Sequence, residues 1–217
     1  MEKDDTIRTV NDAARFRPEA VIVGNGDFPT HPVPLRLMDN APCVVCCDGA
    51  ANRYLQSGRI PFRIVGDGDS IDPLWRERHA AIIRHNPDQE TNDQTKAVHY
   101  LHERGIHRIA IVGATGRRED HTLGNISLLA TYQETGLDVH MYTDHGVFVP
   151  AQGNCRFHAR PGAQVSIFSF GTQGMRAEGL KYPIRDFTSW WQGTLNEALT
   201  EEFTIRCSGT YLVFINY

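Results

Sequence analysis

The sequence predicts an α/β fold in which a doubly wound, mostly parallel sheet is followed by an antiparallel β-sandwich. In the first part of the chain, short apolar runs alternate with amphipathic segments, which is typical of parallel strands joined by helices. Further on, apolar runs follow one another directly and are separated by turn pairs such as Gly153-Asn154 and Pro161-Gly162. We therefore expect an α/β domain over residues 1–142 and a β-sandwich domain over residues 143–217.

The first domain should contain six strands at short apolar runs and four helices where apolar residues recur at helical spacing. The strands are expected at Ala20–Val23, Cys43–Cys47, Arg63–Val65, Ile82–His85, Arg108–Val112 and Val139–Tyr142. The helices are expected at Leu35–Asn40, Ala50–Ser57, Thr91–Arg104 and His121–Thr135. A capping box, with Thr91 as N-cap and Gln94 three residues later, places Asp93 in the first turn of its helix.

The second domain should consist of strands and turns. The strands are expected at Cys155–Ala159, Gln164–Phe170, Met175–Glu178, Phe203–Cys207 and Tyr211–Ile215. Ser208-Gly209 is expected to form a turn between the last two. At the other end of the chain, residues 1–19 are polar and without periodicity, so they are expected to form a loose end from which Phe16 could dock on the first domain.

The composition argues against several classes of protein. The net charge is −4, from 22 basic and 26 acidic side chains, and no run of Lys or Arg appears, which argues against nucleic acid as a partner. No uninterrupted apolar stretch is as long as a membrane span. The polar start, Met1-Glu2-Lys3-Asp4-Asp5, has no apolar signal core, so we expect a cytoplasmic protein.

The five cysteines are an odd number, which argues against a disulfide framework. Cys43 and Cys46 have the C-x-x-C spacing of zinc ligands, but no second Cys/His pair stands nearby at metal-site spacing. The run Pro42–Cys47 is better explained as a buried strand in which cysteine packs as a small apolar residue.

The segment Gly66-Asp67-Gly68-Asp69-Ser70 carries the strongest indication of chemistry. It follows an apolar strand, and two carboxylates two residues apart can point to the same side of the backbone. Oxygen ligands of this kind suit Mg²⁺, which commonly binds together with the phosphates of a substrate. An ordinary Asp/Gly turn is the alternative interpretation of this segment.

Unusual clusters also follow the other strands of the first domain, where open α/β sheets bind ligands. Gly24-Asn25-Gly26 fails as a dinucleotide motif because Pro29 stands where a third glycine is needed, and no P-loop sequence occurs. Asp93 could compensate a helix dipole or add a third carboxylate to the metal site. Arg117 and Arg118 present guanidinium groups, whose fork geometry suits phosphate oxygens.

These clusters, in this order, resemble the motifs of the thiamine pyrophosphokinase family over nearly the whole chain after about residue 20. The matching segments are Asp48-Gly49-Ala50-Ala51-Asn52, Gly66-Asp67-Gly68-Asp69-Ser70, Asp88-Gln89-x-x-Asn92-Asp93, Gly116-Arg117-Arg118-Glu119-Asp120-His121, Gly179-Leu180-Lys181-Tyr182-Pro183 and Gly193-Thr194-Leu195-Asn196-Glu197. The resemblance implies a homodimeric enzyme that transfers the β,γ-pyrophosphoryl group of ATP to thiamine, giving thiamine diphosphate and AMP.

The resemblance also implies a role for each matching residue. Mg²⁺ would be held by Asp67, Asp69 and Asp93, and these aspartates with Asp120 would form the catalytic set. The ATP side of the site would comprise Asp48, Asn52, Arg117, Arg118 and His121. Thiamine would contact Gln89 and Asn92, together with Trp190, Trp191, Thr194 and Asn196 from the partner subunit's sandwich.

Residue chemistry leaves two roles open. Either Asp93 or Asp120 could accept the proton of the attacking alcohol. The tryptophans at positions 190 and 191 could bind the thiazolium cation of thiamine, worth roughly 0.5–2 kcal/mol, or pack in the sandwich and its interface.

Three positions depart from the family pattern, and two alternative functions stay open. Gly68 replaces an aromatic residue, Asn92 a threonine and Leu195 a serine. The change at position 195 favours the first alternative, a diphosphokinase for a hydroxymethylpterin or a similar heterocycle. The second alternative is a sensor that binds thiamine diphosphate without catalysis, which the intact aspartates argue against.

Overall fold

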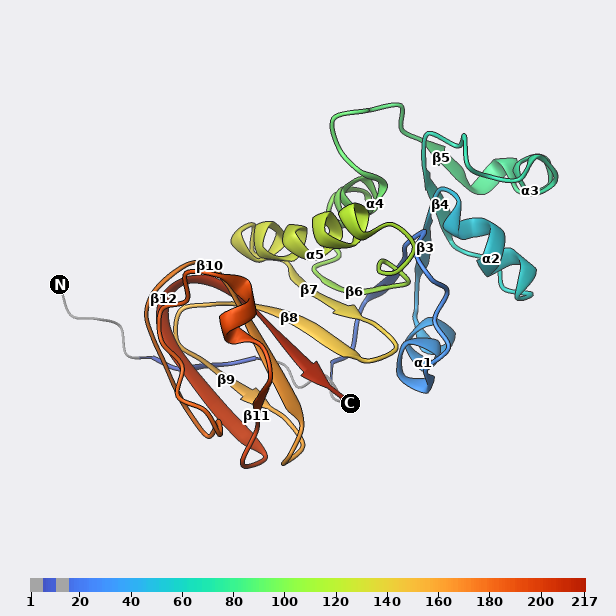
Figure 1. Ribbon diagram of the computed structural model, residues 1–217. Coiled ribbons are helices and arrows are strands. Elements are labelled where there is room, and N and C mark those ends of the chain that lie inside the picture. Colours follow the sequence, from blue (N-terminus) through green and yellow to red (C-terminus); the bar gives the residue numbers. More distant parts are fainter. Residues whose placement is uncertain (1–5, 11–15) are drawn as a thin grey trace. The chain divides into compact units, whose positions relative to one another are not determined.

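The computed structural model of this protein describes residues 6–10 and 16–217 (Figure 1). These residues divide into two compact units. The α/β unit comprises Pro18–Leu128 and Leu137–Asp144. The β unit comprises the described residues up to Arg17, together with Leu129–Gly136 and His145–Tyr217.

The α/β unit is built on a parallel sheet with the strand order β7-β6-β2-β3-β4-β5. The strands are β2 (Ala20–Val23), β3 (Val44–Cys47), β4 (Arg63–Gly66), β5 (Ile83–His85), β6 (Arg108–Val112) and β7 (Asp138–Tyr142). The chain builds the sheet outward from β2 to β5 and then returns to place β6 on the free side of β2. This arrangement confirms the predicted doubly wound sheet and puts its topological switch point between β2 and β6.

Helices cover both faces of this sheet, with α4 on one side and α2 on the other (Figure 1). The helices are α1 (Pro32–Asn40), α2 (Ala50–Gln56), α3 (Pro73–Arg78), α4 (Asp93–His102) and α5 (Glu119–Glu134), with a 3₁₀ turn η1 at Ala80–Ile82. Covered faces explain why β2 and β6 are apolar without alternation, since parallel strands are buried on both sides.

Two local predictions in this unit were wrong. The helix α3 was not predicted, because six residues are too few to show a helical period; it begins at the Asp72 cap and Pro73. The N-cap of α4 is Asn92 instead of Thr91, and the Asn92 side chain accepts a hydrogen bond from the Thr95 N–H at 2.9 Å. Asn is among the best N-cap residues and is preferred to Thr at that position.

Apart from the short β1, the β unit is an antiparallel sheet organised around two long strands, which confirms the predicted antiparallel second half. Its strands are β1 (Arg8–Thr9), β8 (Gly146–Gln152), β9 (Cys155–His158), β10 (Gln164–Glu178), β11 (Asn196–Glu197) and β12 (Glu202–Asn216), with a 3₁₀ turn η2 at Trp190–Gly193. β12 pairs with β10 along most of its length, with β9 near its start and with β8 near its end. The core includes Phe157 and Phe203, whose rings stack at 5.1 Å, and the buried Tyr211.

The strand boundaries of the β unit differ from the predicted ones. Ser208-Gly209 is not a turn, because β12 continues through it while β10 shifts register between Phe170 and Arg176. Glycines with positive φ, Gly171 at 86° and Gly209 at 89°, absorb the irregularity without ending either strand. β8 was missed because Pro150 interrupts its pattern.

The predicted loose end is partly wrong. Arg8–Thr9 form β1, which pairs in parallel with β9, and Phe16 is buried. Positions 1–5 and 11–15 of that prediction lie outside the described residues.

All five cysteines are free, as expected. Cys46 and Cys47 are buried in β3, where burial raises the pKa of each thiol. Within residues 6–10 and 16–217, none of the helices combines the length and the apolar character needed to cross a bilayer.

Leu195 has a left-handed backbone with φ 64°, and its side chain is 71% exposed. A left-handed conformation costs a non-glycine residue roughly 1–2 kcal/mol, and little burial is lost on truncation here. We expect Leu195→Gly to raise the free energy of unfolding by about 1 kcal/mol in urea titrations. Leu199→Gly is the control, since exposed Leu199 lacks a positive φ and should lose stability instead; equal effects would contradict the strain.

The Asp144 carboxylate fixes the segment before α1, since it accepts hydrogen bonds at 3.0 Å from the backbone N–H groups of Thr30 and His31. Burial raises its pKa, but the hydrogen bonds from the Thr30 hydroxyl and from these two N–H groups outweigh burial and hold the pKa below the usual 3.8. This stabilisation should be present above pH 3.8 and lost as the pH falls through the lower native pKa. We expect Asp144→Ala to lose about 1 kcal/mol of stability at pH 7 and less in acid. A stability difference that stays constant with pH would contradict this.

Candidate active site

The loops that follow β2 and β6 meet at the switch point of the sheet. The Gly26 N–H donates to the Gly113 carbonyl at 2.7 Å, and a Cβ on Gly26 would lie 2.2 Å from the Thr115 oxygen. Only glycine therefore allows this approach. A pocket of about 450 Å³ opens here, where doubly wound sheets bind ligands.

The pocket is lined by residues from the ends of several strands, from the loops that follow them and from helices α4 and α5. They are Gly24, Asn25, Gly26, Cys47, Asp67, Ser70, Gln89, Thr91, Asn92, Asp93, Gln94, Lys96, Ala114, Gly116, Arg117, Arg118, His121 and Asn125.

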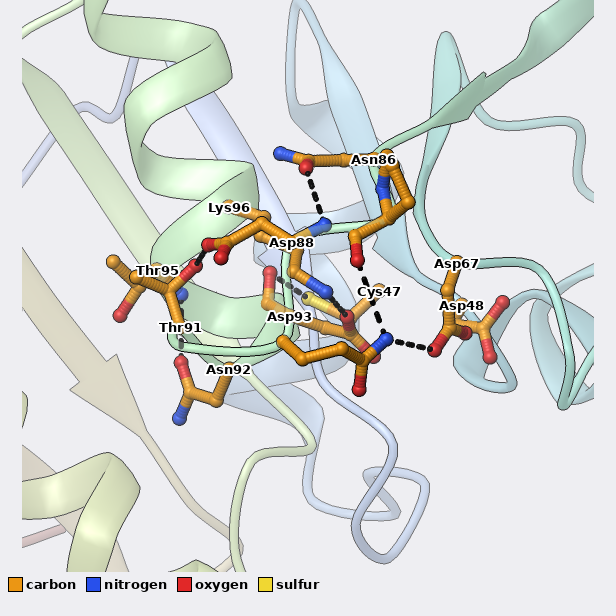
Figure 2. A network of polar contacts seen from close by, with 12 residues as sticks. Cys47, Asp48, Asp67, Asn86, Asp88, Thr91, Asn92, Asp93, Thr95 and Lys96 are labelled. Carbon is orange, nitrogen blue, oxygen red and sulfur yellow. Dashed lines mark hydrogen bonds and ion pairs between the residues drawn. The ribbon is translucent and has the colours of Figure 1, made fainter.

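Three carboxylates gather beside this pocket. One oxygen from each of Asp48, Asp67 and Asp69 lies within 4.8 Å of the others, and Asp67 also lines the pocket. Figure 2 shows Asp48 and Asp67 next to each other. Hydrogen bonds from the Asp69 N–H and from Gln89 hold the pKa of Asp67 below its usual range. The prediction paired Asp67 and Asp69 with Asp93, whereas the structure adds Asp48 to them.

Asp48 is the buried member of this cluster, with 2% of its surface exposed. Its Oδ2 accepts from the Ser70 N–H at 3.0 Å, but Oδ1 has no hydrogen-bond partner in the described part of the chain. Burial, followed by the nearby charges of Asp93 and Asp67, raises the pKa of Asp48. Its backbone φ of 30° is also unusual for a non-glycine residue. A buried, orphaned carboxylate oxygen beside two further carboxylates fits a divalent cation bound by oxygen ligands.

Asp93 begins α4 and forms an ion pair with Lys96, at 3.2 Å between Oδ1 and Nζ. Lys96 is only 5% exposed and lines the pocket, so a cation is buried beside the carboxylate cluster (Figure 2). The sequence analysis missed Lys96. Its signal was its position three residues after Asp93, which places both on one helix face.

The segment between β5 and α4 is held by its own side chains (Figure 2). Asp88 accepts hydrogen bonds from the Thr91 hydroxyl and from the Glu90 N–H. Gln89 donates to Asp67 at 3.3 Å, and Asn92 donates to Asn125 at 3.0 Å while capping α4. Both Gln89 and Asn92 line the pocket, and their amides already bind protein groups.

Two arginines follow β6 with different partners. Arg117, with a left-handed φ of 58°, donates through Nη1 to Asn25 and lines the pocket. Arg118 is bound to Asp120 through both Nε and Nη2. That ion pair lowers the pKa of Asp120 to about 2 and raises the pKa of Arg118. The exposed His121 also lines the pocket.

Asn52 stabilises the loop that carries Asp69. Its side chain accepts from the Asp72 N–H and donates to the Ser70 carbonyl, both at 2.9 Å, so its amide shapes the turn that carries Asp69.

The remaining predicted residues belong to the β unit and differ in exposure. Trp190 packs edge-on against Phe168 and donates to the Ser169 carbonyl, whereas Trp191 is 75% exposed. The Thr194 hydroxyl donates to the Trp191 carbonyl at 2.7 Å. The buried Asn196 makes two hydrogen bonds with the Tyr182 backbone.

Two family models match the chain and together cover most of it. Residues 35–141 match "Thiamin pyrophosphokinase, catalytic domain", and residues 146–214 match "Thiamin pyrophosphokinase, substrate-binding domain". The chain belongs to the thiamine pyrophosphokinase family.

Individual relatives agree with this assignment. Thiamine pyrophosphokinase 1 of Oryza sativa subsp. japonica is 27% identical over 86% of this chain and 82% of its own. Thiamine pyrophosphokinase 3 of the same plant is 33% identical over 43% of this chain and 45% of its own. The solved thiamin pyrophosphokinase from Candida albicans shares the fold, with a TM-score of 0.80 at 18% identity over 97% of this chain and 93% of that one.

Proposed function

We propose that this member of the thiamine pyrophosphokinase family transfers the β,γ-pyrophosphoryl group of ATP to the hydroxyethyl oxygen of thiamine, giving thiamine diphosphate and AMP. One observation carries the chemistry: a carboxylate cluster stands beside a pocket that Lys96, Arg117 and Arg118 line with positive charge. Phosphoryl chemistry depends mainly on positioning and charge neutralisation, and this site supplies groups for both.

We assign the metal ligands to Asp48, Asp67 and Asp69. The orphaned oxygen of Asp48 and the mutual distances support this set, and oxygen ligands of this kind suit Mg²⁺. Bound there, Mg²⁺ would supply neutralisation of phosphate charge. Asp93 lines the same pocket and is ion-paired with Lys96. The Lys96 ammonium group is available there to a phosphate oxygen.

In the reaction, the thiamine hydroxyl oxygen attacks the β-phosphorus, and the bond between that phosphorus and the oxygen bridging to the α-phosphorus breaks. AMP leaves with that oxygen, and the alcohol proton passes to a carboxylate. We assign the acceptor to Asp93, which lines the pocket. Asp120 is a poorer base, since its ion pair with Arg118 lowers its pKa to about 2.

We propose that Trp191 contacts thiamine. We also propose that the protein is a homodimer and that it works in the cytoplasm. Trp191 is 75% exposed, and a large apolar side chain left in solvent is free to contact a ligand or a partner. The free cysteines suit a reducing compartment.

We expect Trp191→Ala to raise the KM for thiamine about tenfold and to leave the KM for ATP unchanged, because an aromatic face stabilises the thiazolium cation. Steady-state kinetics with each substrate varied in turn measures both constants. Trp190→Ala is the matched control: it removes the packing on Phe168 and should lower the melting temperature, which Trp191→Ala should not. Equal changes in both KM values for Trp191→Ala would show a packing role instead.

The function is tested by product analysis after incubation of the purified protein with Mg·ATP and thiamine. The proposal predicts AMP and thiamine diphosphate in equal amounts, and no AMP without thiamine. A hydroxymethylpterin serves as a control acceptor, since both family models and the named relatives are thiamine pyrophosphokinases. AMP formation with the pterin but not with thiamine would overturn the substrate assignment.

A further inference from the structure

Arg117 holds a backbone conformation that its residue type disfavours. Its φ is 58°, in the left-handed region, and it follows Gly116, whose φ is 81°. Such outliers persist only where surrounding contacts fix them, and they cluster at functional sites. Among the described residues, the hydrogen bonds of the Arg117 side chain go to one residue: Nη1 donates to the Asn25 carbonyl at 3.1 Å and to the Asn25 Oδ1 at 3.0 Å.

The other end of the Asn25 amide faces the start of α2. A Cβ on Gly49 would lie 2.6 Å from the Asn25 Nδ2, so the amide occupies space that only a glycine at position 49 leaves open. Gly49 follows Asp48 directly in the chain and is the N-cap of α2. Asn25, which follows β2, therefore contacts the loop that carries the metal-binding carboxylate and the loop that carries Arg117.

In the part of the chain that the structure describes, this arrangement uses only one of the three guanidinium nitrogens of Arg117 as a donor. Within the described part of the chain, its Nε and Nη2 donate to no protein group, whereas both corresponding nitrogens of Arg118 are bound to Asp120. Arg117 is thus the guanidinium at this pocket that can bind a phosphate in the bidentate manner.

We infer that Asn25 is a positioning residue that aims Arg117 at the phosphates of ATP by holding one of its terminal nitrogens and leaving the other donors free. The inference rests on the proposed function for its substrate. Asn25 acts through Arg117 and not on the substrate itself. Its side chain is exposed at the pocket rim, so its removal should leave the fold unchanged.

The test is a double-mutant cycle with Asn25→Ala, Arg117→Ala and the double variant, read out by the Kd for Mg·α,β-methylene-ATP, an ATP analogue whose α,β bridge cannot be cleaved. Arg117→Ala should weaken binding by on the order of a hundredfold and Asn25→Ala by about tenfold. The double variant should bind no more weakly than Arg117→Ala alone, since Asn25 has nothing left to position. The matched control is Asn40→Ala, which removes an exposed asparagine bonded only to the carbonyl of Arg36 in the described structure.

Each outcome decides the inference. Effects that multiply in the double variant, or wild-type affinity in Asn25→Ala, would overturn it. In activity assays, Asn25→Ala should raise the KM for ATP and leave the KM for thiamine within about twofold, and equal changes would also contradict it. Because nucleotide binding needs no acceptor, a non-additive binding cycle without thiamine turnover would support the inference while refuting the proposed function.

Discussion

Asp48→Asn is expected to lower thiamine-dependent AMP formation by on the order of a thousandfold without unfolding the protein. The amide oxygen can still accept from the Ser70 N–H, so the loop keeps its hydrogen bond. The variant loses the negative charge that a cation requires at the buried, unpartnered Oδ1. Removing a buried unpaired charge should also leave the metal-free variant at least as stable as the wild type.

Thermal melting with and without MgCl₂ separates this effect from a general loss of structure. Mg²⁺ that binds only the native state should raise the melting temperature of the wild type but not that of Asp48→Asn. Asp72→Asn is the matched control, since Asp72 caps α3 outside the cluster and asparagine is an equally good cap. An Asp48→Asn variant with normal turnover and a normal Mg²⁺ shift would refute the metal assignment.

Lys96→Met is expected to lower kcat/KM for ATP by about a hundredfold or more. Methionine keeps most of the apolar stem, so the packing of α4 is preserved while the buried ammonium group is lost. Asp93, its ion-pair partner, has 35% of its side chain exposed and can be solvated once Lys96 is removed. We therefore expect the loss to appear in catalysis more than in stability.

Kinetics with ATP varied at saturating thiamine, together with melting temperatures, test this expectation. Lys181→Met is the control: it also breaks a lysine ion pair, here 2.9 Å from Glu197, but on the exposed surface of the β unit. Exposed ion pairs contribute little, so this variant should resemble the wild type. If Lys96→Met and Lys181→Met show the same kinetics, Lys96 does not act in the active site.

Much of the α/β unit could be predicted from the sequence, because parallel strands that are buried on both faces appear in the sequence as unbroken apolar runs. Ala20–Val23 and Arg108–Val112 were predicted with the bounds they have. Elements without a clear hydrophobic pattern were missed. Helix α3 is too short to show a helical period, and Pro150 interrupts the apolar pattern of β8. The long strands of the β unit were predicted as pairs of strands, because glycine bulges look like turns in sequence.

The positions of the strand ends in the sequence were enough to predict which residues gather at the site. Parallel strands bring their carboxyl ends to one edge, so the gathering of Asp67, Asp93 and Arg117 followed from their positions. The partners of each group did not follow, because they depend on the bend of individual loops. The burial of Asp48 is a property of the folded chain alone, whereas the three-residue spacing of Asp93 and Lys96 in one helix did signal their pairing.

The central claim is that two phosphorus atoms of ATP move together to thiamine. The most direct measurement is a single-turnover reaction with Mg·ATP labelled at the γ-phosphate, followed by separation of all products. We expect the label in thiamine diphosphate, unlabelled AMP as the nucleotide product and no thiamine monophosphate as an intermediate. Label recovered as inorganic phosphate or thiamine monophosphate, with ADP as the nucleotide product, would contradict it.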